Sequence, residues 1–169
     1  MNPVSSETLQ RLLAEHRGAL LLYARQWCAT AEDVVQESFL QLVKQREEPE
    51  NVVGWLYRVV RNRAISAARS AGRRARHEAA AAGRREPWFV GHAELRLDAE
   101  AATAALEQLP PALRETVVAR IWGGLSFVEI AQLTGTSSST AARRYHDGLV
   151  AIRERLAVAC PHTKNSHRN

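Results

Sequence analysis

The stretch from Gly124 to Leu156 constrains this chain more than any other part, because it reads as two helices joined by a tight turn. Ser126 and Glu129 have the spacing of a capping box, in which each side chain bonds a free backbone N–H at a helix start. Gly135 stands where a residue in the left-handed conformation would turn the chain. The pattern predicts a helix-turn-helix.

The second helix of this pair has two different faces. Ser137 or Ser138 can cap its start. Apolar residues spaced three or four apart form the inward face, namely Ala141, Tyr145, Leu149, Ile152 and Leu156. The opposite face carries Ser139, Ala142, Arg143 and His146. Such a helix fits a DNA-reading element better than an ordinary helical hairpin with a solvated face.

The rest of the chain is also helical by periodicity, and no segment alternates with the period of two that a half-buried strand requires. A loop is expected at residues 46–53, which contain Pro49. The apolar periods predict helices that begin near Ser5 or Ser6, Thr30 or Ala31, Gly54, Leu97 and Pro111.

We therefore expect an all-α fold of two small helical domains joined by a flexible linker. The expected parts are a first domain at 1–74, a linker at 75–100, a second domain at 101–158 and a tail at 159–169.

Positive charge is concentrated in one part of the chain. The formal net charge is +5, yet the stretch from Trp55 to Arg85 alone contains nine arginines and a single acidic residue, Glu78. In the helix expected from Gly54, arginines fall opposite an apolar stripe. This arrangement predicts a surface that follows phosphate backbones, in preference to a surface for an acidic protein partner.

Several other classes of protein are disfavoured. No apolar run of about 18 residues is present to span a membrane, and the N-terminus lacks the pattern of a secretory signal. Two cysteines, Cys28 and Cys160, fit a reducing cytoplasm. The chain lacks a glycine-rich phosphate loop and an HExxH motif; Cys160, His162 and His167 leave a metal site in the tail as a minor alternative. We expect a cytoplasmic protein that is not an enzyme and has no cofactor, metal or membrane insertion.

The order of the parts resembles an extracytoplasmic-function (ECF) sigma factor of bacterial RNA polymerase. The resemblance covers residues 8–157 and rests on AEDVVQESFLQLVKQ, then GWLYRVVRNRAISAAR, then ALEQLPPALRETVVARIWGGLSFVEIAQLTGTSSSTAARRYHDGL. It implies two globular parts, sigma region 2 and sigma region 4, which serve the −10 and −35 promoter elements. It implies core RNA polymerase and promoter DNA as partners, and leaves an anti-sigma factor open as a third.

The same resemblance assigns site residues. The resemblance implies a contact with core polymerase, and not a place in the protein's own hydrophobic core, for Asp33, Gln36, Glu37 and Phe39. The −10 element, with a base extruded from its strand, would be held by Arg58, Arg61, Asn62 and Arg63. The −35 duplex would be read by Ser137, Ser138, Ser139, Thr140, Arg143, Arg144 and His146.

Two aromatic residues of the helix expected from Gly54 have two candidate roles, base stacking and core packing. Trp55 and Tyr57 are candidates to stack on bases, although Trp55 fits a core position better. The chain departs from the family pattern at three positions. Ala142 stands where a basic residue is frequent, and Arg143 stands where a small residue is usual. Ser66 stands where an acidic residue is frequent.

Two other functions explain parts of the chain. A stand-alone helix-turn-helix regulator, which is not a polymerase subunit, would account for the C-terminal half. Such a regulator usually carries a sensor or phosphorylation domain with strands, whereas the N-terminal half here is helical by pattern. An adaptor for an acidic partner would leave the serine-capped helix unexplained.

Overall fold

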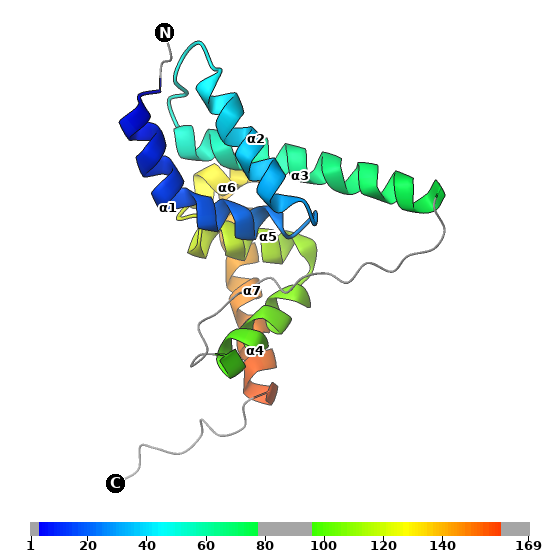
Figure 1. Ribbon diagram of the computed structural model, residues 1–169. Helices are drawn as coiled ribbons and strands as arrows, with labels where there is room; N and C mark the ends of the chain where they lie inside the picture. Colours follow the sequence, from blue (N-terminus) through cyan, green and yellow to red (C-terminus); the bar gives the residue numbers. More distant parts are fainter. Residues whose placement is uncertain (1–3, 78–95, 160–169) are drawn as a thin grey trace.

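The computed structural model describes residues 4–77 and 96–159, and regular structure in these ranges is entirely helical. The helices are α1 (Ser6–Ala24), α2 (Ala31–Val43), α3 (Val52–His77), α4 (Arg96–Glu107), α5 (Pro111–Ile121), α6 (Phe127–Thr134) and α7 (Ser138–Ala159). Figure 1 shows that the C-terminal half of α3 extends away from the other helices. The predicted all-α class is confirmed.

Helices α1, α2 and α3 pack into one bundle, which we call the N-terminal unit. Ser5 caps α1, because its Oγ accepts a hydrogen bond of 3.0 Å from the backbone N–H of Thr8. Side chains three or four positions apart on each helix face the bundle centre, where Leu20, Leu42 and Leu56 have no exposed surface. The predicted starts of α1 and α2 are thus confirmed.

Helix α3 begins two residues earlier than the sequence predicted. Asn51 Oδ1 accepts a hydrogen bond of 2.8 Å from the backbone N–H of Gly54, as an N-cap side chain does. A Cβ at Gly54 would lie 2.9 Å from Asn51 Nδ2, so glycine at this position leaves room for the cap. The loop before α3 accordingly spans residues 44–51, two positions earlier than the predicted 46–53 and equal to it in length.

Helices α4 to α7 form the C-terminal unit, in which α5 and α6 both pack on α7. The predicted capping box is present: Ser126 Oγ accepts from the backbone N–H of Glu129, and Glu129 Oε2 accepts from that of Ser126 at 2.7 Å. Gly135 ends α6 with φ of 68°, a left-handed conformation that glycine adopts at little cost. The helix-turn-helix prediction is confirmed in this geometry.

The predicted linker at 75–100 overlaps helix at both ends, because α3 continues to His77 and α4 begins at Arg96. Residues 78–95 lie outside the described residues. So does the tail from residue 160, including Cys160, His162 and His167.

The two units pack against each other and share a continuous hydrophobic core, which the sequence did not predict. Helix α5 lies against α1, and α6 lies against α3. Tyr23 of α1 and Tyr57 of α3 are fully buried at this contact, with ring centroids 4.9 Å apart at an angle of 67°. A Cβ at Gly123 would lie 2.7 Å from Tyr57 Oη, so the small residue after α5 permits the close approach of the units.

Candidate protein and nucleic-acid interfaces

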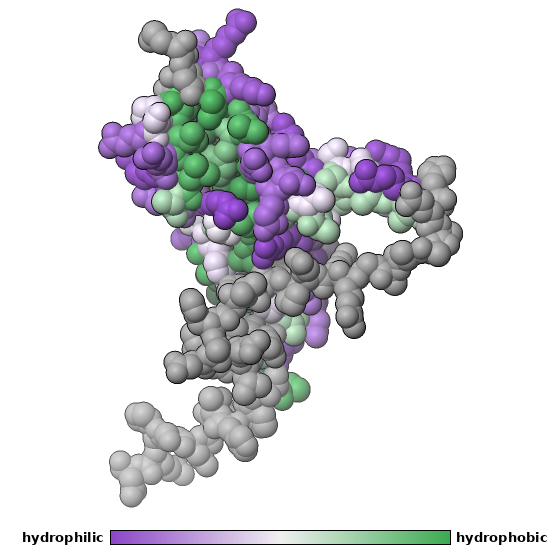
Figure 2. Space-filling model, in the orientation of Figure 1, coloured by the Kyte–Doolittle hydropathy of each residue, from purple (hydrophilic) through white to green (hydrophobic). Residues whose placement is uncertain are grey.

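The outer face of α2 combines acidic, amide and apolar side chains. Asp33, Gln36 and Glu37 are exposed and share one face, because they lie three or four residues apart. Leu40 continues this face three residues after Glu37 and is 50% exposed. We call these four residues the α2 surface. Figure 2 shows further hydrophobic residues gathered over α1 and α2.

Phe39 does not belong to the α2 surface, and its assignment to a polymerase contact rather than the internal core is wrong. Its side chain is only 5% exposed and packs within the core. At about 100° per residue, Phe39 lies roughly 200° around the helix from Glu37. The sequence did contain the signal for the exposed apolar residue, because Leu40 follows Asp33 by seven residues and therefore shares its face.

The predicted −10 residues of α3 point in different directions. Arg58 and Asn62 are exposed and lie four residues apart on one face. Arg63 turns toward α2, where it pairs with Glu37 and donates from Nη2 to Gln41 Oε1 at 3.0 Å. Arg61 turns toward α5. The structure thus brings Arg58 and Asn62 together but separates Arg61 and Arg63 by roughly 200° around the helix.

Arg61 is held in a buried network that the sequence did not predict. Glu115 of α5 is 6% exposed; its Oε1 accepts from Tyr23 Oη at 2.6 Å and from Arg61 Nε at 2.7 Å. Burial, followed by the charge of Glu115, raises the pKa of Tyr23 well above its usual value. The hydrogen bond to Glu115 raises the pKa of Arg61. Tyr23 is therefore a neutral donor and Arg61 a cation, which together compensate the burial of the carboxylate.

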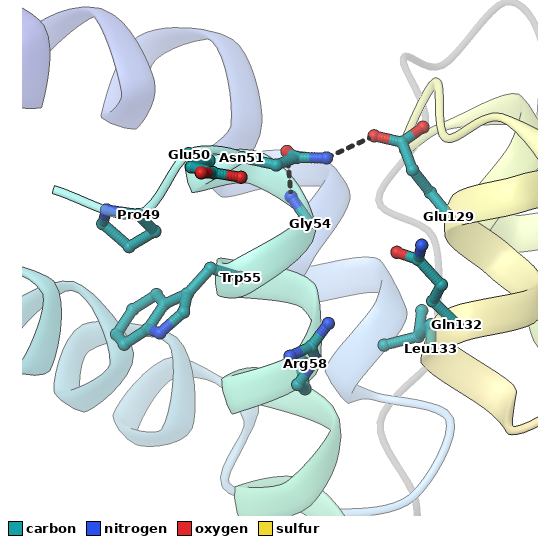
Figure 3. A pocket seen from close by; sticks show the side chains of 9 residues that line it. All are labelled: Pro49, Glu50, Asn51, Gly54, Trp55, Arg58, Glu129, Gln132 and Leu133. Carbon is teal, nitrogen blue, oxygen red and sulfur yellow. Dashed lines mark hydrogen bonds between the residues drawn. The ribbon is translucent and has the colours of Figure 1, made fainter.

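A cavity of about 290 Å³ lies between the start of α3 and α6. Its lining residues are Pro49, Glu50, Asn51, Gly54, Trp55, Arg58, Glu129, Gln132 and Leu133. Figure 3 shows Asn51 bonded to Glu129 across the cavity, with Trp55 directed toward Pro49 and Arg58 on the side of α6. The bond joins Asn51 Nδ2 to Glu129 Oε1 at 2.7 Å.

The two aromatic candidates for base stacking differ. Trp55 is half-buried and lines the cavity, so part of its ring remains accessible. Tyr57 has no exposed surface and is out of reach of a base in this arrangement. Its assignment to base stacking is corrected to a core position at the contact between the units.

Helix α7 presents the predicted outer face. Ser137 is the N-cap, since its Oγ accepts from the backbone N–H of Thr140 at 3.1 Å, and Ser138 is the first helical residue. Arg143 is exposed, whereas Arg144 is half-buried. The remaining candidates on this helix are Ser139 and His146, both exposed. The serines, Thr140 and the basic residues thus lie at one end of one helix.

The described residues contain no group of three or more histidine, cysteine or acidic side chains placed to hold a metal ion. In the same ranges, 4–77 and 96–159, no helix is both long and apolar enough to cross a membrane.

Two family models match the chain, one on each unit. The model described as Sigma-70 region 2 matches residues 12–74, and that described as Sigma-70, region 4 matches residues 99–152. The RNA polymerase sigma factor CarQ of Myxococcus xanthus is 36% identical over 141 residues, which are 76% of this chain and 75% of CarQ. The ECF RNA polymerase sigma factor SigD of Mycobacterium tuberculosis is 24% identical over 160 residues, or 90% of this chain and 76% of SigD.

Two solved structures share the fold. Sigma factor RpoE from Bartonella quintana, in complex with the anti-sigma factor NepR, superimposes with a TM-score of 0.69 and 23% identity over 91% of this chain and 99% of that one. CnrH, in complex with the cytosolic domain of CnrY, gives a TM-score of 0.61 and 21% identity over 91% and 90%.

Proposed function

This chain belongs to the sigma-70 family as an ECF sigma factor, and from that premise we propose how its two units divide the recognition of polymerase and promoter. As a sigma factor, it directs promoter-specific initiation by RNA polymerase. This division of roles between the units rests on one observation, namely that each of the two family models matches one unit. The region 2 match at 12–74 also disfavours a stand-alone regulator, which would need only the helix-turn-helix.

The N-terminal unit binds core polymerase through the α2 surface. Asp33 and Glu37 offer carboxylates to basic side chains, and Leu40 supplies the apolar anchor that such an interface needs at its centre. Gln36 lies between them and can bond polar groups. In this assignment Phe39 supports the surface from beneath without touching the partner.

The same unit holds the −10 element along α3. Arg58 and Asn62 share an exposed face, so a phosphate and a base of one strand can meet them together. Arg61 and Arg63 extend this surface on its two sides once they leave Glu115 and Glu37. Trp55 at the cavity offers part of a ring for stacking on an unpaired base.

The C-terminal unit reads the −35 element with α7 in the major groove. Ser137, Ser138, Ser139 and Thr140 lie in the first turn, where hydroxyls and free backbone N–H groups suit phosphate contacts. Arg143 and His146 follow on the exposed face. Arg144 lies at its flank, where a guanidinium suits phosphate.

We place this activity in the cytoplasm, where polymerase and chromosome are found, and expect no catalytic activity from the chain itself. An anti-sigma factor is a further partner in this proposal, because both structural relatives were solved with one or with the cytosolic domain of a second protein.

Run-off transcription with purified core polymerase on genomic fragments tests the proposal. The chain should yield discrete transcripts from a subset of fragments that core polymerase alone does not transcribe. Sequencing of their 5′ ends should reveal shared elements about 10 and 35 positions upstream. Transcripts identical to those of core polymerase alone would exclude a sigma function.

A further inference from the structure

A single acidic residue, Asp147, stands on the outer face of α7 among basic and hydroxyl side chains. It follows Arg143 by four residues, so the two side chains are neighbours on the helix surface, and both are exposed. Between Ser138 and Leu149 the sequence contains no other acid. Asp147 is not among the residues assigned above to the −35 element, yet it shares their face.

Packing against α5 fixes which side of α7 points outward. Ala141 is 1% exposed, and Gly148, seven residues later, is also buried. A Cβ at Gly148 would lie 2.6 Å from Val117 Cγ2, so glycine permits a close contact between α5 and α7 at this point. At about 100° per residue, Asp147 lies roughly 40° around the helix from Arg143 and roughly 100° from Gly148. A duplex that meets Arg143 therefore also meets Asp147.

The carboxylate of Asp147 is available to a ligand. Its side chain is 54% exposed, and its Oδ1 lies 3.7 Å from His146 Nδ1. This separation exceeds the roughly 3.2 Å of an ordinary hydrogen bond. An ionised carboxylate accepts hydrogen bonds at both oxygens and donates none. Asp147 thus presents a pure acceptor beside the guanidinium of Arg143.

The chemistry of the major groove limits what such an acceptor binds. Duplex DNA carries one negative charge per roughly 1.7 Å of its axis, which repels a carboxylate that gains no hydrogen bond. Cytosine N4 and adenine N6 are the hydrogen-bond donors of this groove, whereas guanine O6 and N7 and thymine O4 are acceptors. Cytosine N4 is the usual partner of aspartate and glutamate. A carboxylate on this face therefore favours cytosine and disfavours guanine and thymine.

We propose that Asp147 is a specificity-determining residue that selects cytosine at one position of the −35 element by accepting a hydrogen bond from its N4 amino group. The proposal rests on the sigma function argued above and on α7 as the helix in the major groove. Four helical residues advance about 6 Å, and base pairs rise by about 3.4 Å. The selected cytosine thus lies within about two base pairs of the base that Arg143 contacts.

Transcription of a promoter pool by the holoenzyme tests this assignment. A fragment transcribed in the run-off experiment supplies the parent promoter, and every position of its −35 element is randomised. Each template carries a barcode in its transcribed part, so sequencing of the transcripts measures the output from each −35 sequence. Core polymerase is combined with the natural chain, with Asp147→Ala or with the matched control Glu154→Ala. Glu154 is exposed about two turns further along α7, and its substitution makes the same change of charge.

The natural chain should favour cytosine over guanine and thymine at one position by at least about fivefold, which corresponds to about 1 kcal/mol. Asp147→Ala should remove this preference, whereas Glu154→Ala should retain it. Asp147→Asn should shift the preference toward adenine, because an asparagine amide bonds N6 and N7 of that base. Thermal melting of Asp147→Ala should match that of the natural chain, since the side chain is exposed.

The alternative outcomes are distinct. An unchanged ranking of promoters with Asp147→Ala overturns the proposal, and so does an equal rise for all sequences, which would show that the carboxylate only repels the backbone. A natural preference for adenine that Asp147→Ala removes would overturn cytosine as the selected base. The sigma function stands in all three cases. Failure of the natural chain to transcribe any fragment with core polymerase would reject the sigma function and this proposal together.

Discussion

Arg143 and Arg144 are adjacent in sequence, but α7 gives them different surroundings. Arg143 is exposed on the outer face, opposite the buried Ala141 and the half-buried Tyr145, whose ring lies 5.7 Å from that of Phe127. Arg144 is half-buried at the flank. An exposed guanidinium at the centre of the outer face can bond the O6 and N7 atoms of one guanine, whereas one at the flank reaches the backbone.

We predict that Arg143→Ala relaxes the preference at one −35 position, with a loss of about 1–3 kcal/mol of discrimination. Arg144→Ala should weaken binding to all −35 sequences by a similar factor. A series of −35 base substitutions, measured with both variants, checks the assignment. An unchanged ranking of promoters with Arg143→Ala would mean that another face of α7 meets the bases.

The hydrogen bonds between Ser126 and Glu129 make the stability of the folded chain depend on pH. Hydrogen bonds from Ser126 are the largest cause that lowers the pKa of Glu129 below its usual 4.5. Because its pKa is lower in the folded state, Glu129 contributes stability above pH 4.5, and this contribution disappears as the pH falls through the folded value.

Glu129→Gln should therefore be less stable than the natural chain at pH 7, and the difference should shrink below about pH 4.5. Thermal melting of both proteins between pH 7 and pH 3 measures it. A difference that stays constant over this range would show that the charge of Glu129 does not contribute to folding.

At the scale of single elements, α2 shows what periodicity and family resemblance each provide. Periodicity placed its start correctly, because a helix start depends on residues close in sequence, and the resemblance named Asp33, Gln36 and Glu37, which are exposed. The resemblance included Phe39 in the contact, but the packing of α2 on α1 and α3 decides which apolar residues are buried. Leu40 is left outside that packing, 50% exposed.

We predict different effects for substitutions of the two neighbouring apolar residues of α2, one on polymerase binding and one on stability. Leu40→Ala should weaken association with core polymerase and change the free energy of unfolding by less than about 0.5 kcal/mol, as expected for an exposed site. Phe39→Ala should lower that free energy by about 3–5 kcal/mol. Urea unfolding and a pull-down with core polymerase measure the two effects.

The charged residues of the same face provide a second test of the α2 surface. Changing Asp33 and Glu37 together to arginine should abolish core binding, with helicity and melting nearly unchanged, because both side chains are exposed. Collapse of melting in this double variant would show that the residues are structural and that the docking surface lies elsewhere.

Helix α3 carries a second prediction at this scale. Arg58→Ala should weaken all promoters similarly and reduce the magnitude of the salt slope by about 0.7–0.9, the value of one phosphate contact. Asn62→Ala should instead reduce open-complex formation and discrimination in the −10 element, with little change of slope. A promoter-specific effect of Arg58→Ala would show that this arginine reads bases.

At the scale of the whole molecule, the sequence predicted both units but not the contact between them. Each unit follows from local signals such as the capping box at Ser126 and the apolar stripe of α7. The bond from Tyr23 to Glu115 joins residues 92 positions apart. Nothing in the spacing around Glu115 marks it, because a single acid beside apolar residues is ordinary in an amphipathic helix. Long-range pairing of this kind depends on the packed surfaces.

The shared core leads to a prediction about cooperativity. Because buried residues of both units form one continuous cluster, the full chain should unfold in a single calorimetric transition whose van't Hoff and calorimetric enthalpies agree. Glu115→Ala leaves Arg61 and Tyr23 without their buried acceptor, which weakens the contact between the units while each keeps its own helices. This variant should melt in two transitions, one for each unit. Two transitions in the natural chain would show that the contact is too weak to couple the units.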